Sequence, residues 1–155
     1  MRIHLLTVGK PRDAALLALC DRYIQRASPV FRIEWSAVPD GDPRGSKVPA
    51  RAVEAEGQRL LKRLDAGCLA VALDERGKTR TSRELARWLG RLRDEGQSLQ
   101  LVVGGAHGLA PAVLKRCPQR MALSAMTLPH DLALVVLLEQ LFRARAILMG
   151  EPYHH

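Results

Sequence analysis

The chain has 155 residues, a length typical of one compact domain, and we expect a single domain over residues 1–155. Apolar residues make up 47% and charged residues 26%, which excludes the disordered class and allows a sizeable core. Lys and Arg number 24 against 16 Asp and Glu, giving a formal net charge of +8. This balance favours a polyanionic partner such as nucleic acid.

The sequence predicts neither export, nor a membrane span, nor a metal site. Its cysteines, Cys20, Cys68 and Cys117, form neither an even disulfide framework nor a Cys-x-x-Cys pair for zinc or redox chemistry. The longest unbroken apolar stretch, Leu132–Leu138, has seven residues, whereas a membrane-spanning helix needs about 20. We therefore expect a cytoplasmic protein with no membrane partner and no metal.

Apolar runs alternate with segments of helical period, which predicts an α/β fold with a mostly parallel sheet flanked by helices. The predicted strands are Arg2–Val8, Phe31–Val38, Cys68–Leu73, Leu99–Val103 and Arg120–Leu123. The predicted helices are Arg12–Arg26, Ala50–Leu64, Ser82–Glu95, Pro111–Arg116 and Leu132–Met149. Val38–Pro49 is rich in turn-forming residues and predicts a mobile surface loop, either a connector or a substrate gate.

Two of the predicted helices carry local start signals. Thr81 followed by Glu84 predicts a capping box, and Asp131 offers a carboxylate to the start of the last helix, which Gly150 ends. Apolar residues wrap every side of that last helix over Leu132–Leu138. A helix that is apolar all round must be buried on all faces, and a subunit interface can supply the missing cover.

Positive charge is concentrated in Arg76–Arg93, where seven basic residues stand against the single acid Glu84. Arg83, Arg87 and Arg91 recur every four residues, so they line one side of the predicted helix. Two interpretations are open. The arginines form either a ridge that neutralises nucleic-acid phosphates without reading sequence, or an ordinary solvated helix face.

A predicted strand runs into a glycine-rich turn at Leu101–Gly108, which is where α/β sheets bind ligands. The Gly-Gly-x-x-Gly spacing of Gly104, Gly105 and Gly108 matches neither the dinucleotide fingerprint nor the phosphate P-loop. Taken alone, the turn is equally an ordinary tight turn. The uncharged segment Leu123–Leu128 suits a flat heteroaromatic ring, with a buried connecting loop as the alternative.

The end of the chain combines charged, aromatic and histidine residues. Glu139 and Arg143 are four apart and can pair along one helix face. Tyr153, His154 and His155 close the chain. Taken alone, the two terminal histidines are also typical of a purification remnant or a frayed end.

The glycine turn, the loop and the tail together, in this order and at these spacings, resemble the RlmH family of large-subunit rRNA pseudouridine N3-methyltransferases, members of the SPOUT class. The motifs are Ile3–Gly9, Ala72–Asp74 with Gly77 and Lys78, Val103–Leu109, Leu123–His130, Glu139–Ala144 and Glu151–His154. The resemblance implies a C-terminal trefoil knot and a homodimer. It also implies S-adenosylmethionine as methyl donor and 23S rRNA in the assembled ribosome as acceptor.

By motif match, the resemblance implies a methyl-donor site formed by Leu73, Gly104, Leu123, Ser124, Ala125, Met126, Thr127 and Leu128. It places Tyr153 and His154 close to the donor methyl. His154 is the expected proton relay, Arg143 the expected holder of the nucleotide or of its developing charge, and Tyr153 the residue that stacks on or orients the base. Ala106 and His107 depart from the family pattern within the glycine turn, and His155 stands where Arg or Lys is commoner.

Two other function classes compete with this interpretation. A non-enzymatic basic module that binds RNA or the ribosome needs only the arginine ridge. A doubly wound nucleotide-binding enzyme would also use the glycine turn, but the glycine spacing disfavours it.

Overall fold

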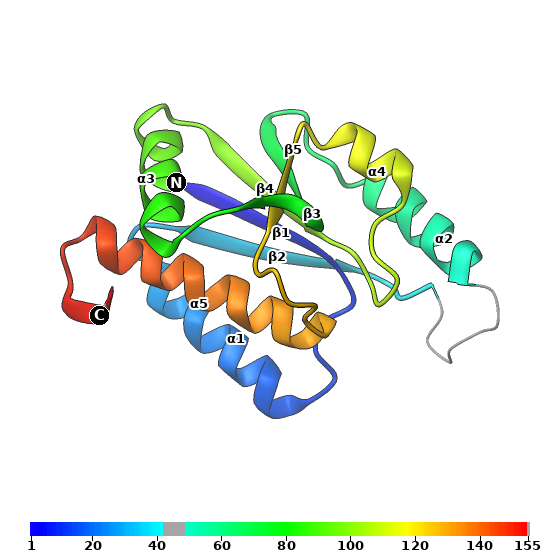
Figure 1. Cartoon of the computed structure of the whole chain (residues 1–155), viewed down its shortest axis with the longest axis horizontal. Coiled ribbons are helices and arrows are strands. Elements are labelled where there is room, and N and C mark those ends of the chain that lie inside the picture. Colours follow the sequence, from blue (N-terminus) through cyan, green and yellow to red (C-terminus); the bar gives the residue numbers. More distant parts are fainter. Residues whose placement is uncertain (42–48, 155) are drawn as a thin grey trace.

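The computed structural model describes residues 1–41 and 49–154, and only the backbone of residue 154. Its elements are β1 Arg2–Val8, α1 Ala14–Ala27, β2 Arg32–Val38, α2 Pro49–Leu61, β3 Cys68–Thr79, α3 Ser82–Asp94, β4 Ser98–Val103, α4 Pro111–Arg116, β5 Gln119–Ala122, α5 His130–Leu148 and the 3₁₀ turn η1 Pro152–His154. The strands form one parallel sheet in the order β2-β1-β4-β3-β5, with helices on both faces (Figure 1). The predicted α/β class and parallel sheet are confirmed, whereas the knot stays a prediction.

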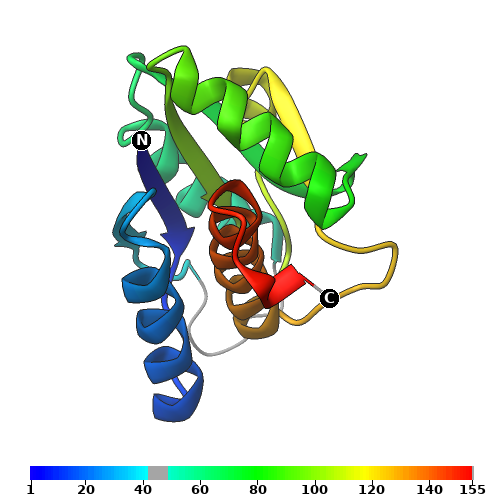
Figure 2. The same cartoon turned by 90° about the vertical axis from the view of Figure 1, so that its left-hand side faces the viewer.

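The helices divide between the two faces of the sheet. Side chains alternate along each strand, so Ile3 and Leu5 of β1 join the core beneath α1, α3 and α5, whereas Leu6 and Val8 join a second core beneath α2 and α4. On the first face α5 lies between α1 and α3 (Figure 2). The molecule is therefore a three-layer sandwich whose longest helix is covered from two sides.

Packing leaves part of α5 uncovered. Leu134, Leu137 and Leu138 are fully buried, but 44% of Leu132 is exposed. Val135 and Val136 are only half-buried, so the prediction that this helix is buried on all faces does not hold within one chain. Leu132 and the half-buried Val136 form an apolar stripe that the described residues do not fully cover.

The predicted elements agree with the structure to within three residues, with one exception at the end of β3. That strand continues past the predicted end at Leu73 to Thr79, and its register against β5 shifts so that both Leu73 and Lys78 face Met121. Gly77 permits the close approach, because a Cβ there would lie 2.5 Å from the amide nitrogen of Met121. Residues 74–79 are polar or glycine, so the hydrophobic pattern did not predict that the strand continues through them.

The starts of α3 and α5 differ: α3 begins at a side-chain cap, whereas α5 begins after Pro129 without one. The predicted capping box is confirmed, because the Glu84 amide donates to Thr81 Oγ1 at 3.2 Å and the Thr81 amide donates to Glu84 Oε2 at 2.7 Å. The helix α5 begins at His130 with Pro129 at the N-cap, and Asp131 lies inside its first turn rather than at the cap. The predicted loop over Val38–Pro49 lies mostly outside the described residues.

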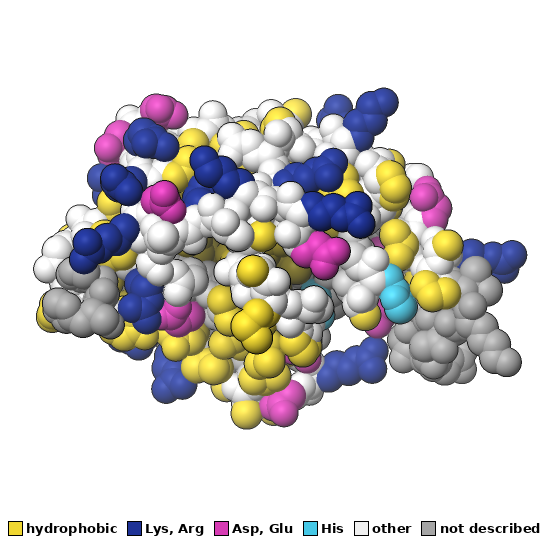
Figure 3. Space-filling model, viewed as in Figure 1, with side chains coloured by type: hydrophobic (Ala, Val, Ile, Leu, Met, Phe, Trp, Pro, Cys, Tyr) yellow, Lys and Arg dark blue, Asp and Glu magenta, His cyan; other side chains and the backbone are white. Residues whose placement is uncertain are grey.

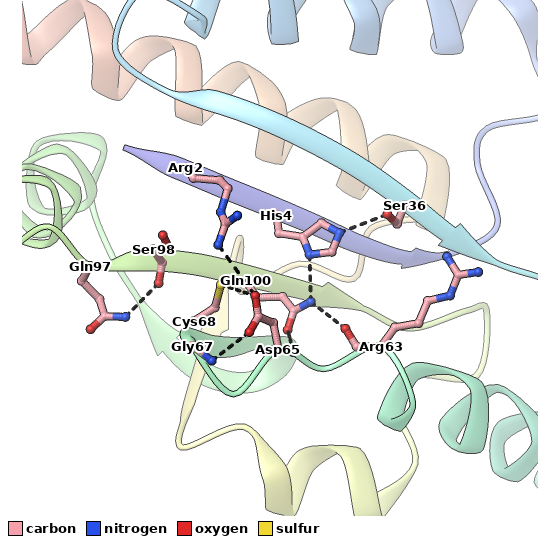
Figure 4. A network of polar contacts seen from close by, with 10 residues as sticks. All are labelled: Arg2, His4, Ser36, Arg63, Asp65, Gly67, Cys68, Gln97, Ser98 and Gln100. Atoms are coloured by element: carbon pink, nitrogen blue, oxygen red, sulfur yellow. Dashed lines mark hydrogen bonds and ion pairs between the residues drawn. The ribbon is translucent and has the colours of Figure 1, made fainter.

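A buried polar network ties three strands together on the α2 side of the sheet (Figure 4). Gln100 of β4 is fully buried, and its amide nitrogen bonds to His4 Nδ1 at 3.1 Å and donates to the Arg63 carbonyl at 3.0 Å. The Asp65 amide donates to Gln100 Oε1, and His4 Nε2 bonds to Ser36 Oγ, each at 3.0 Å. All polar groups of the buried amide are thus satisfied, which holds β1, β2 and β4 in one register.

Candidate functional site

The parallel register brings three predicted donor-binding segments to one edge of the sheet. Leu73 in β3 is opposite Val103 of β4 on one side and Met121 of β5 on the other. Gly104 directly follows Val103, and Leu123 follows Met121 by two residues. Because the carboxyl ends of parallel strands meet at the same edge, these segments lie together where α/β sheets bind ligands.

The glycine turn after β4 is closed by its own backbone. The Gly108 amide donates to the Gly105 carbonyl at 3.0 Å, and Gly108 has a φ of +81°, which favours glycine. A Cβ at Gly104 would lie 2.6 Å from the Gly108 carbonyl carbon. Ala106 and His107, the two departures from the family pattern, are exposed at the tip. The glycine at position 104 is therefore required by the turn itself.

A buried carboxylate lies against the back of this turn. Glu56 of α2 is only 5% exposed, and its Oε1 accepts a hydrogen bond from the Gly41 amide at 2.9 Å. A Cβ at Gly105 would approach Glu56 Oε2 to 2.9 Å. The neighbouring Gly57 lets α2 approach α4, since a Cβ there would lie 2.6 Å from Ala110 Cβ. Close helix packing thus places an acid directly against the candidate site.

Burial raises the pKa of Glu56, and the charge and hydrogen bond of Asp40 raise it further, against the lowering effect of the Gly41 amide. Sequence reasoning missed this residue. The sequence did carry a signal for it. Glu56 lies four residues after Ala52 and four before Leu60, so it shares the apolar face of the predicted helix with these two buried residues.

The loop after β5 offers free main-chain groups. Within the described parts of the chain, Ser124–Leu128 makes no backbone–backbone hydrogen bond, and the Met126 amide donates only to Ser124 Oγ at 2.9 Å. The half-buried residues of the segment are Leu123, Ser124 and Leu128, and the exposed ones are Ala125, Met126 and Thr127. Unpaired amides and carbonyls beside apolar side chains suit a flat heterocyclic ligand.

A cavity of about 240 Å³ adjoins this loop, and Arg80, Ser82, Leu123 and Gln140 are among the residues that line it. Ser82 Oγ donates to Gln140 Oε1 at 2.7 Å. The Arg80 guanidinium lies 4.6 Å from the centre of the Trp88 ring, and its buried Nη1 has no hydrogen-bond partner among the described residues. The cavity therefore has one cationic wall.

The tail is anchored to α5. Arg143 donates through Nε and Nη2 to Glu139 Oε1 at 3.0 and 2.6 Å, which confirms the predicted pair, and through Nη1 to the Tyr153 carbonyl at 3.0 Å. The Tyr153 ring meets the Phe142 ring edge-on at 4.5 Å. The backbone of His154 completes η1. Arg143 thus acts as a positioning residue for the tail in this structure.

The tail packs at the C-terminal end of α5, whereas the Ser124–Leu128 part of the donor loop leads into its N-terminal end (Figure 1), and Leu123 lies beside the middle of the helix, where it lines one cavity with Val136 and Gln140. Arg143 lies about 20 Å along the helix axis from His130, at 1.5 Å per residue. Tyr153 is held near Arg143, whereas the Leu123–Leu128 loop leads into the other end of the helix. One chain alone therefore does not bring the tail to the loop. His155 lies outside the described residues.

Residues 1–41 and 49–154 contain neither a metal-binding cluster nor a membrane-spanning helix. No group of three or more His, Cys, Asp or Glu side chains there is placed to hold a metal ion. No helix in those residues is long and apolar enough to cross a membrane. The candidate site consists instead of main-chain groups, guanidiniums and a buried carboxylate.

Comparison with known proteins agrees with this geometry. A family model described as "Predicted SPOUT methyltransferase" matches residues 1–154. The chain belongs to the SPOUT methyltransferase family. A relative from Gemmatimonas aurantiaca is 42% identical over 155 residues, covering 99% of each chain, and one from Nitratidesulfovibrio vulgaris is 44% identical over 154 residues, covering 99% of this chain and 98% of the relative. Both are named ribosomal RNA large subunit methyltransferase H, which confirms the family resemblance.

Solved structures share the fold of this SPOUT chain. A probable methyltransferase from Bordetella pertussis has a TM-score of 0.53 at 21% identity, covering 93% of this chain and 95% of that one. A probable methylase family protein from Haemophilus influenzae has a TM-score of 0.56 at 14% identity, covering 99% of this chain and 70% of that one. At these identities the likeness shows the fold alone.

Glu56→Gln tests the buried carboxylate. Because the pKa of Glu56 is raised in the folded chain, its stabilising contribution is fully present below the ordinary carboxyl pKa of about 4.3 and is lost as pH rises through the raised value. Glutamine imitates the protonated acid, so the Tm of the variant should exceed that of the wild type by a margin that grows from pH 4 to pH 8. Circular dichroism melts measure this margin. The exposed Glu54→Gln should show no such trend, and a margin independent of pH for Glu56→Gln would contradict the assignment.

Proposed function

We propose that this chain transfers a methyl group from S-adenosylmethionine to N3 of a pseudouridine in the 23S rRNA of the assembled ribosome, in the cytoplasm. The observation that carries the proposal is the full-length relationship to proteins named ribosomal RNA large subunit methyltransferase H, at 42% and 44% identity. The meeting of Leu73, Gly104 and Leu123 at one sheet edge supports it, because that edge is the binding position of the fold.

The residues that would hold the methyl donor are Leu73, Gly104 and Leu123–Leu128. Their fit rests on the unpaired main-chain groups of the loop and on the half-buried apolar side chains of Leu73 and Leu128. When bound, S-adenosylmethionine supplies an electrophilic methyl group, so the protein has only to align it and to prepare the acceptor. Glu56 lies directly behind the glycine turn.

The acceptor imide N–H of pseudouridine is a weak acid, and its proton has to leave for N3 to become nucleophilic. We assign His154 as the proton acceptor, because an imidazole exchanges protons near neutral pH. Arg143 has five N–H donors, of which its bonds to Glu139 and Tyr153 use three. The others can hold a phosphate or the developing imidate charge, with Tyr153 orienting the base.

A homodimer would unite the two halves of this site. The Ser124–Leu128 part of the donor loop leads into the N-terminal end of α5 and the tail packs at its C-terminal end, so the tail of one copy would serve the loop of the other. Leu132 and Val136 are four residues apart and share a helix face, and Leu132 is 44% and Met126 77% exposed. An apolar stripe of this kind is what a second copy would cover.

Methylation itself is tested on ribosomes from a strain that lacks this modification. Tritiated S-adenosylmethionine and the wild-type chain should label one pseudouridine, identified by mass spectrometry of the nucleosides. His154→Ala should slow labelling by a factor of about 10² to 10⁴, the usual contribution of a general base, with unchanged donor affinity. A wild-type chain that binds ribosomes but transfers no methyl would favour the non-enzymatic RNA-binding module.

Gly104→Val tests the donor site. The new side chain would clash with the Gly108 carbonyl at 2.6 Å, so the turn should open and the affinity for S-adenosylmethionine should fall by a factor of ten or more, measured by calorimetry. Ala106→Val at the exposed tip is the matched control and should bind normally. Normal affinity of Gly104→Val would remove the turn from the donor site.

Mixing two defective variants tests the shared site. Thr127→Trp fills the donor loop and His154→Ala removes the proton acceptor, so each homodimer should be inactive. In a 1:1 co-expressed mixture, mixed dimers carry one intact site each, which should restore about a quarter of wild-type activity. Activity no greater than that of the separate variants, or a monomer in light scattering at micromolar concentration, would contradict the shared site.

A further inference from the structure

We propose that α3 carries a docking surface for the sugar–phosphate backbone of the RNA strand that bears the acceptor base. Lys78, Arg83, Arg87 and Arg91 form it, and we call it the α3 basic surface. The inference deepens the proposed function and rests on it, because it assigns to that reaction the face of the enzyme that meets the RNA.

The arginines of this surface are displayed toward solvent at a regular spacing. Arg83, Arg87 and Arg91 are exposed, and four residues of helix place them about 6 Å apart along the axis. Leu85 and Leu89 on the opposite side of α3 are 5% and 0% exposed, which fixes the orientation of the helix. Figure 3 shows Lys and Arg side chains over α3 and also across the rest of this face of the molecule, with acidic side chains among them.

Like several exposed arginines elsewhere, such as Arg22 and Arg51, these cations have no ion-pair partner among the described residues. Within the described residues no ion pair reaches any member of the α3 basic surface. Arginines that do pair with carboxylates are Arg2, Arg12, Arg32, Arg93, Arg143 and Arg145. The charge of the surface is therefore available to a ligand that approaches from solvent.

The only acid between Lys78 and Arg91 is Glu84, and its carboxylate caps the start of α3. Glu84 closes the capping box with Thr81, and the hydrogen bond from the Thr81 amide holds the pKa of Glu84 below its usual value, aided by the charges of Arg87 and Lys78. Like charges four residues apart disfavour a helix. The repeat is therefore not explained by helix stability, whereas an external polyanion would be attracted by it.

The α3 basic surface leads to the candidate site. Lys78 lies opposite Met121 in β5, two residues before Leu123. Arg80 lies between the α3 basic surface and the donor loop. Its guanidinium stacks on Trp88 of α3, and Arg80 lines the same cavity as Leu123. An RNA strand that lies along α3 would thus reach the donor loop at the end of the α3 basic surface.

The chemistry of the surface fits RNA phosphates. Guanidinium groups match phosphate oxygens in a planar fork, and a row of them follows a repeating anion without reading its bases. Such contacts release counterions, so affinity falls with salt by about 0.7 to 0.9 logarithmic units per logarithmic unit of salt for each phosphate neutralised. Three arginines should therefore contribute a slope of about 2 to 3.

The test compares two full-length variants that each lose three charges. One is Arg83→Gln, Arg87→Gln and Arg91→Gln. The matched control replaces Arg51, Lys62 and Lys115 with Gln. These three residues are exposed in or next to α2 and α4, on the other face of the sheet. Binding to fluorescent polyuridylate is measured by anisotropy between about 50 and 200 mM salt, and KM and kcat are measured on unmethylated ribosomes.

We expect the α3 variant to lose about 2 to 3 units of salt slope on polyuridylate and to raise KM tenfold or more on ribosomes, with kcat, Tm and donor affinity near wild type. The control should lose less than one unit. A variant with Lys in place of the same three arginines should keep the wild-type salt slope. Arg87→Gln alone leaves the rest of α3 unchanged and should lower the slope by about 0.7 to 0.9 units.

Equal slopes for the α3 variant and the control would overturn the proposal. A higher KM on ribosomes with unchanged polyuridylate binding would also overturn it, because the surface would then meet a ribosomal protein. If the wild type binds polyuridylate through this surface but transfers no methyl, the proposed function fails and the docking surface stands.

Discussion

Burial of α5 between α1 and α3 is the constraint on which the rest of the structure depends. Each fully buried leucine of this helix, such as Leu134, Leu137 and Leu138, contributes about 2 kcal/mol by leaving water. The helix is thereby held lengthwise on one face of the sheet. Its start fixes the end of the donor loop, and its last turns, with Arg143, fix the tail. The distance between the two halves of the proposed site follows from the length of one buried helix.

The donor side of the site depends on close backbone approaches rather than on charged ligands. Gly57 brings α2 against α4, which in turn sets Glu56 behind the glycine turn, and Gly77 brings the end of β3 against β5. Parallel pairing then aligns the turn and the loop at one sheet edge. A ligand recognised by main-chain groups needs such an edge, because loose loops would not hold unpaired amides in a fixed arrangement.

Electrostatics divides the arginines of the chain into two groups with different tasks. Arg143 is bound to Glu139 and to the tail, so its charge organises the protein. Arg83, Arg87 and Arg91 face solvent without carboxylate partners among the described residues, so their charge acts on what approaches from outside. Within α3 itself four arginines stand against Glu84 and Asp94, so this helix carries +2 of the formal net charge of +8.

Local sequence determined most elements, because hydrophobic period and capping residues act within a few positions, as Thr81 and Glu84 show. The family motifs also identified the segments that meet at the sheet edge. Tertiary structure alone decided the extension of β3 to Thr79, the placement of Glu56 against Gly105, and the position of the tail at the C-terminal end of α5. These depend on which segments pack together across the fold, and no short stretch of sequence carries that information.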